Sequence, residues 1–204
     1  RYTDLGLFTI DPDIGHDATE LFNYLTTGLK PKRNYRKLQV APKLLKKWLL
    51  AKIKEEVEYH AQGEEGHIRI KCNALADGDI IDALYAAGRS GVCVELIIRD
   101  SCALRPGLLG VSENIRVVSV VGRFLEHSRI YYFSQGGKEL YLLGSADLLT
   151  RNLERRVEVL VPVTKANLKK ELKTVLQHYL QPDAGSWVMR ADGTYHKNEP
   201  TPAE

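Results

Sequence analysis

Residues 67–100, "HIRIKCNALADGDIIDALYAAGRSGVCVELIIRD", decide the fold class. Apolar and polar residues alternate over 67–75, which predicts a β-strand. Residues 77–91 have acidic residues early and glycines late, as helices do, and residues 92–100 form a second apolar run typical of a strand. The order strand, helix, strand is typical of a layered α/β domain in which helices cover a mixed β-sheet.

The flanking sequence extends this pattern on both sides. Residues 41–63 predict the clearest helix, because Leu45, Trp48, Leu49 and Ile53 recur at helical spacing. The remaining expected helices cover 17–28 and 164–180, and the remaining expected strands cover 1–11, 115–121, 129–133, 139–145 and 155–163. The sequence "DPDIG" at 11–15 predicts a turn, "QGGK" at 135–138 predicts a hairpin turn, and 101–114 predicts a loop. We expect the polar end, residues 190–204, to be frayed.

Charge is spread unevenly along the chain. The 204 residues carry a net charge of +3, which by itself does not indicate nucleic acid, and we expect none as a partner. Eight basic residues fall between positions 30 and 47: Lys30, Lys32, Arg33, Arg36, Lys37, Lys43, Lys46 and Lys47. Two interpretations stay open, a solvated linker and helix face or a patch that faces a polyanion.

The cysteines and the chain start bound the cellular context. Cys72, Cys93 and Cys102 show no CxxC pair and no metal-ligand spacing, so we expect no metal site and a reducing, cytoplasmic compartment, with peripheral membrane association left open. No transmembrane segment or signal peptide is expected. The chain starts at Arg1 and its only methionine is Met189, which predicts a piece of a longer protein.

Polar residues gather where predicted strands begin or end. Arg99 ends one strand, His127 and Arg129 open another, and Ser145 ends a third after Gly144. We expect these strand ends to converge, as they do at the sites of layered α/β folds. Histidine transfers protons near neutral pH, arginine binds phosphate oxygens in pairs, and a Gly-Ser turn lets backbone N–H groups approach an anion. The combination predicts phosphate chemistry.

Each residue taken alone also has a structural interpretation. His127 fits an ordinary surface histidine, and Arg99 fits an ion-pair partner of Asp100 or Glu95. A Gly-Ser pair is a turn more often than a site. The functional hypothesis therefore depends on the strand ends meeting.

The spacing of His127, Arg129 and the Gly-Ser pair resembles the H-x-K…G-S half-site of phospholipase D-like enzymes. Arg129 stands in place of the lysine, and Ser134 in place of the usual aspartate, so the motif is degenerate. The glutamate that orients the histidine in such enzymes is matched by Glu158, for which an ion pair with Arg155 or Arg156 is the alternative.

Longer blocks resemble the C-terminal part of bacterial polyphosphate kinases. They read "YTDLGLFT", "NALADGDIIDALYAAGRSGVCVELIIRDSCALRPG", "SENIRVVSVVGRFLEHSRIYYF" and "GSADLLTRNLERRVEVLVPV", with a weaker echo in "WVMRADGTY". The resemblance implies that residues 1–36 are the tail end of one phospholipase D-like domain plus a linker, and that residues 37–204 are a second such domain. The family transfers the terminal phosphate of ATP reversibly to polyphosphate, with Mg²⁺, through a phosphohistidine expected upstream of this chain.

The resemblance also implies roles for individual residues. Tyr2 matches a tyrosine of the nucleotide site, Arg99 an arginine that binds phosphate, and His127 the second essential histidine. Lys71, Asn73, Arg129, Ser145 and Glu158 are possible supporting residues, and no metal ligand is implied. Asp100 stands where the family usually has glycine, which would weaken the local positive field.

We therefore expect a polyphosphate kinase fragment that supplies part of the site and is inactive alone. Its expected partners are ATP or ADP, inorganic polyphosphate, the upstream domains and, at full length, further copies in a homo-oligomer. Two alternatives stay open: a phospholipase D-like phosphodiesterase half-site that acts as a dimer, and a non-catalytic module that binds polyanions.

Overall fold

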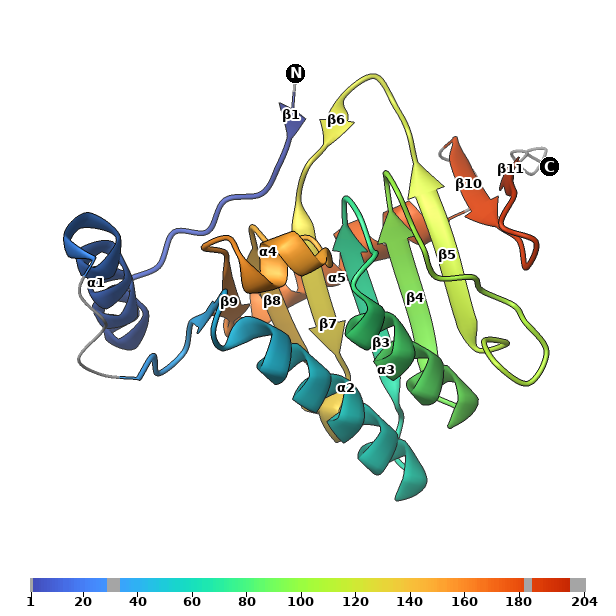
Figure 1. Ribbon diagram of the computed structural model, residues 1–204, viewed down its shortest axis with the longest axis horizontal. Helices are drawn as coiled ribbons and strands as arrows, with labels where there is room; N and C mark the ends of the chain where they lie inside the picture. Colours follow the sequence, from blue (N-terminus) through green and yellow to red (C-terminus); the bar gives the residue numbers. More distant parts are fainter. Residues whose placement is uncertain (1, 29–33, 182–184, 199–204) are drawn as a thin grey trace.

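A nine-stranded mixed sheet forms the centre of the computed structural model, which describes residues 2–28, 34–181 and 185–198 (Figure 1). The strand order is β11-β10-β5-β4-β3-β7-β8-β9-β2. The strands are β2 (Gln39–Val40), β3 (His67–Cys72), β4 (Cys93–Ile98), β5 (Ile115–Val120), β7 (Arg129–Phe133), β8 (Leu140–Gly144), β9 (Val159–Val163), β10 (Ser186–Met189) and β11 (Tyr195–Lys197). Neighbours β3, β4 and β5 run parallel, and every other pair is antiparallel. The predicted mixed sheet is confirmed.

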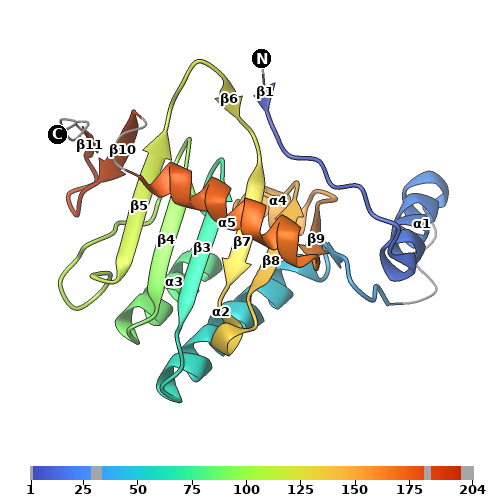
Figure 2. The same ribbon diagram turned by 180° about the vertical axis from the view of Figure 1, so that it is seen from behind.

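Helices cover both faces of this sheet. Helices α2 (Leu45–Ala61), α3 (Gly78–Arg89) and α4 (Thr150–Glu154) lie over one face (Figure 1), and α5 (Ala166–Leu180) crosses the other (Figure 2). Strand side chains alternate between faces, so Ile68 and Ile70 join the larger core under α2 and α3. Ile97 and Ile130 join the core under α5. None of the described helices is long and apolar enough to cross a membrane.

Helix α2 confirms the predicted apolar face. Leu45, Leu49 and Ile53 are almost fully buried, and Trp48 packs edge-on against Phe133 with ring centroids 6.2 Å apart. The helix starts at Leu45 because residues 41–44 form a turn. Helix α3 buries Ile80 and Leu84 against the same core. Periodicity therefore predicted both helices correctly, apart from their ends.

The N-terminal segment differs from the prediction. The expected strand over 1–11 is reduced to β1 (Tyr2–Thr3), which pairs with β6 (Leu125–Glu126). The expected turn at 11–15 is instead the start of α1 (Pro12–Thr27). Asp11 caps this helix by accepting the N–H groups of Asp13 and Ile14, and proline suits the first helical position.

The C-terminal segment differs from the prediction that residues 190–204 are frayed, because β11 lies within that range. Strand β10 pairs with β5, and β11 pairs with β10, so this segment extends the sheet by two strands. The backbone groups at the free edge of β5 bind β10, and this pairing orders a polar segment whose composition alone does not predict a strand. Residues 199–204 of that prediction lie outside the described residues. Short helix α4 follows β8 and was not predicted.

Ion pairs occupy much of the basic segment. Arg36 contacts Asp13 at 2.6 Å and Lys37 contacts Asp11 at 2.5 Å, so α1 is held to the start of β2. Lys46 is shared among three carboxylates, those of Asp77, Asp79 and Glu154. These members fit the solvated, paired interpretation better than a polyanion patch. Lys30, Lys32 and Arg33 lie outside the described residues.

Candidate functional site

The predicted strand ends meet at one edge of the sheet. Lys71 pairs in register with Ile130, next to Arg129, and Arg129 pairs with Gly144. The carboxyl ends of β3, β4 and β8 therefore share this edge with the start of β7 (Figure 1). The predicted convergence is confirmed, and the group formed by Lys71, Asn73, Arg99, His127, Arg129, Asp147 and Asp4 is called the strand-end cluster below.

Asp147 lies at the centre of the strand-end cluster. It accepts two hydrogen bonds from Arg129, at 3.1 Å from Nε and 3.0 Å from Nη2, and one from the Asn73 backbone at 2.8 Å. Burial disfavours the charged guanidinium, but the bonds to Asp147 outweigh it and raise the pKa of Arg129. Asp147 therefore neutralises and orients Arg129. Sequence reasoning gave it no role, although it follows the Gly-Ser pair by two residues.

The His127 imidazole contacts a carboxylate and a guanidinium. Its Nδ1 lies 3.1 Å from Asp4 Oδ2, and Arg129 Nη1 lies 3.0 Å from Nδ1 and 3.2 Å from Nε2. A hydrogen bond to the Asp4 carboxylate requires the proton on Nδ1, and in that tautomer Nε2 is the nitrogen that accepts from Arg129. Burial opposes ionisation of Asp4, but the bond to His127 outweighs it and lowers the pKa of Asp4. Tyr2 packs edge-on against the imidazole, with centroids 5.3 Å apart.

Glu158 does not orient His127. One carboxylate oxygen accepts a hydrogen bond from the Ser145 hydroxyl, and the other accepts from Asn152 Nδ2 at 2.7 Å. The prediction for Glu158 is wrong on this point, because Asp4 takes that position. Its recorded partners also differ from the arginines of the alternative interpretation.

The Gly-Ser pair joins β8 to β9. The Ser145 N–H donates to the Val159 carbonyl at 3.0 Å, and the Ser145 hydroxyl accepts from the Val159 N–H at 3.2 Å. A Cβ on Gly144 would lie 2.2 Å from the Val159 carbonyl oxygen. The Ser145 N–H is therefore already engaged in the sheet and is not free to bind an anion.

Lys71 is buried beneath the loop that carries His127. Its Nζ donates to the Ser128 carbonyl at 2.9 Å and to the Ser128 hydroxyl at 2.8 Å. It lies 4.0 Å from Glu126 and 4.8 Å from the centre of the Tyr179 ring. Burial lowers the pKa of Lys71 to about 8. Lys71 therefore anchors the segment just before β7 while carrying a weakly held proton.

Arg99 faces a cavity beside the strand-end cluster. The cavity has a volume of about 420 Å³ and is lined by Arg99, Val121, Gly122, Arg123, Phe124 and Leu125. Arg99 Nε donates to Asn73 Oδ1 at 3.3 Å, and no carboxylate within the described residues lies within 4.0 Å of it. Glu95, the suggested ion-pair partner, contacts His67 and Arg69 instead. Sequence reasoning missed Arg123, whose guanidinium lies over the Phe124 ring.

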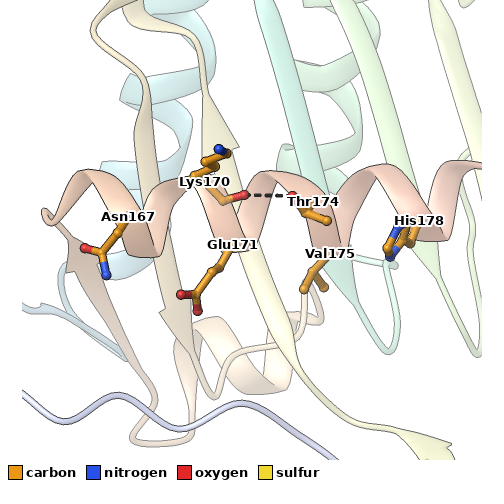
Figure 3. Close-up of a pocket in the computed structure, with 6 residues that line it drawn as sticks. All are labelled: Asn167, Lys170, Glu171, Thr174, Val175 and His178. Atoms are coloured by element: carbon orange, nitrogen blue, oxygen red, sulfur yellow. Dashed lines mark hydrogen bonds between the residues drawn. The ribbon is translucent and has the colours of Figure 1, made fainter.

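A larger hollow of about 580 Å³ lies along α5, and no residue of the strand-end cluster lines it (Figure 3). Its lining comes from one helix: Asn167, Lys170, Glu171, Thr174, Val175 and His178. The bond drawn there, from the Thr174 hydroxyl to the Lys170 carbonyl, is internal to the helix. Side chains from several elements do not converge on it, so the strand-end cluster is the better candidate.

Comparisons with known proteins agree with the predicted resemblance. The family described as "Polyphosphate kinase C-terminal domain 2" matches residues 38–204. Proteins named polyphosphate kinase from Parasynechococcus marenigrum and Synechocystis are 48% and 49% identical over 203 residues, which is 100% of this chain. The chain spans 28% of the length of each.

Solved structures show the same relationship. A polyphosphate kinase from Porphyromonas gingivalis matches 96% of this chain and 30% of its own, with a TM-score of 0.90 and 32% identity. The phospholipase D family member Nuc from Salmonella typhimurium matches 71% of this chain and 92% of its own, with a TM-score of 0.52 and 16% identity. The second likeness shows the phospholipase D-like fold alone.

Proposed function

The chain belongs to the polyphosphate kinase family, as part of its C-terminal region, and from this premise we propose that its strand-end cluster binds the phosphates of ATP and polyphosphate. In the longer protein, the terminal phosphoryl group of ATP would be transferred reversibly to polyphosphate. Such transfer depends mostly on positioning and on neutralising negative charge. Cationic side chains at the sheet edge suit both tasks.

The observation that carries this proposal is the position of Arg99. Arg129 is already neutralised by Asp147, whereas Arg99 faces the cavity and, within the described residues, its side chain hydrogen-bonds to the Asn73 amide alone. Arg123 lines the same cavity and is exposed. A guanidinium keeps its charge at all relevant pH values and pairs with phosphate oxygens. The cavity thus offers two arginines to one polyanion.

His127 would act on a phosphate oxygen at the edge of this cavity. Asp4 holds Nδ1, which leaves Nε2 as the nitrogen that can accept or return a proton. Arg129 would be displaced from Nε2 by the incoming phosphate and remain fixed by Asp147. Asp4 and Asp147 are thus positioning residues, and His127 is the proposed catalytic residue.

The nucleotide and its magnesium ion would enter together. Tyr2 is 68% exposed beside His127, so its ring is free to pack against an adenine. Asp4 and Asp147 are engaged by His127 and Arg129, so we expect Mg²⁺ to arrive on the phosphates of ATP. The histidine that becomes phosphorylated would come from a part of the longer protein upstream of this sequence.

The proposal predicts binding without turnover by this chain. Tripolyphosphate titrated into the chain by calorimetry should bind, and Arg99→Ala should weaken it by about 10- to 100-fold, the value of one charge-assisted hydrogen bond. Arg89→Ala is the matched control, because Arg89 is exposed at the end of α3, outside the strand-end cluster. Equal affinity in both variants would contradict the proposal.

Catalysis requires a test in the longer protein. There, Arg99→Ala or His127→Ala should slow ATP-dependent polyphosphate synthesis by about 100- to 1000-fold. Unchanged chain growth would refute the assigned roles. Hydrolysis of a phosphodiester by the chain alone would favour the phosphodiesterase alternative. One feature argues against that alternative. Ser134 stands in place of the aspartate of the phospholipase D-like motif, but it is buried at the other end of β7 from His127 and donates its hydroxyl hydrogen to Glu56.

A further inference from the structure

A second polar group lies at the opposite end of β3 and β4 from the strand-end cluster. His67 begins β3, and its register partner on β4 is Cys93. Glu95 lies two residues beyond Cys93, so both side chains point to the same face of the sheet. One imidazole nitrogen, one thiol sulfur and one carboxylate oxygen lie within 4.8 Å of one another.

Two of these side chains, His67 and Glu95, have polar neighbours. His67 Nε2 lies 2.8 Å from Glu95 Oε2, and Arg69 Nε donates to the same oxygen at 2.6 Å. His67 Nδ1 lies 3.6 Å from a carboxylate oxygen of Glu65. In metal sites the ligating carboxylate is itself hydrogen-bonded, and the ligating histidine turns its other nitrogen toward a carboxylate. Arg69 and Glu65 stand in those two supporting positions.

The donor set decides which ion fits. Sulfur, imidazole nitrogen and carboxylate oxygen together are typical ligands of Zn²⁺, whereas Mg²⁺ takes oxygen ligands. Cys93 is exposed, and the side chains of His67 and Glu95 are only 11% and 15% exposed. The group is therefore largely buried on one side and open to solvent on the other. We propose that His67, Cys93 and Glu95 bind a zinc-class divalent ion, with the fourth coordination position left to solvent.

Binding would replace a proton with the ion. The imidazole and the thiol must both be deprotonated to coordinate the ion, so binding releases protons to the buffer. The contact between His67 and Glu95 then opens by a few tenths of an ångström, to about the separation of two ligands on one tetrahedral ion.

Cobalt provides the direct test, because Zn²⁺ itself has no d–d absorption. Co²⁺ titrated into the chain should produce a thiolate-to-cobalt absorption band that saturates at one ion per chain and disappears when Zn²⁺ is added. Cys93→Ser should remove the band. Cys102→Ser, a change at a partly buried cysteine outside the group, should keep it. His67→Gln should weaken cobalt binding by at least about tenfold.

Loss of the cobalt band in Cys93→Ser can be distinguished from unfolding. Cys93 is exposed, so its replacement by serine should leave the fold intact, and circular dichroism checks this. A band of equal strength in Cys93→Ser and the unsubstituted chain would overturn the proposal. So would the absence of any thiolate band, or unchanged Zn²⁺ affinity in Cys93→Ser by calorimetry.

Discussion

The buried Lys71 should make the free energy of unfolding of the chain depend on pH. Only 3% of the residue is exposed, and burial lowers the pKa of its ammonium group from 10.5 to about 8. The charged groups that face it are Glu126, Asp4 and Arg129, and the Tyr179 ring packs over it. The net effect of these charged groups on the pKa of Lys71 is smaller than the lowering caused by the loss of solvation.

The magnitude and sign follow from linkage. The difference between 10.5 and 8, at about 1.4 kcal/mol per pH unit, corresponds to about 3 kcal/mol. Below pH 8 the lysine is charged in both states, and the folded state bears the full cost. Between pH 8 and 10.5 the folded protein loses the proton while the unfolded chain keeps it. Stability relative to a variant without this amine should therefore rise across that range.

The assay compares urea unfolding of the chain and of Lys71→Met between pH 7 and 10.5. The difference between their free energies of unfolding should move by about 3 kcal/mol in favour of the lysine. Tyrosines that titrate in the same range contribute to both proteins, so the difference isolates Lys71. Lys54→Met, at a lysine with a 79% exposed side chain, is the control and should give a flat difference. A flat difference for Lys71→Met as well would refute the reasoning.

Three further predictions concern the strand-end cluster and its support. Asp147→Asn should destabilise the chain by about 3–5 kcal/mol in urea unfolding, because it leaves a largely buried Arg129 without its counter-charge; a loss below about 1 kcal/mol would show that Arg129 finds another partner. Gly144→Ala should cost about 1–3 kcal/mol in thermal unfolding, since its Cβ would meet the Val159 carbonyl, and an unchanged melting temperature would contradict this packing. Asp100→Gly should strengthen tripolyphosphate binding by about 1.5- to 5-fold at low salt, the value of one exposed charge, and the gain should fade as salt is raised.

Local periodicity was sufficient for the central strands and helices. The alternation over β3, the helical spacing in α2 and the acidic start of α3 each arise from neighbours within about one or two helical turns. The convergence of Arg99 and Arg129 was also predictable, because strand ends in a layered sheet share an edge. Their roles in catalysis remain predictions.

Contacts between distant residues were not predictable in the same way. His127 and Asp4 are 123 positions apart, and no local pattern marks Asp4 as the acid that holds this histidine. Strand β10 is ordered by β5, and the Ser145 N–H is consumed by Val159. Hydrogen bonds of this kind form only after the sheet register is set.

The proposed metal ligands His67 and Cys93 also show what sequence spacing cannot predict and strand pairing can. Sequence spacing indicated no metal ligands, because His67 and Cys93 are 26 positions apart and belong to different strands. The parallel register of β3 and β4 places them side by side. The sequence by itself determined the central strands β3 and β4 and the helices α2 and α3, since these depend on the periodicity of apolar residues along the chain. The tertiary structure alone decided which polar side chains meet, since that depends on how the strands pair.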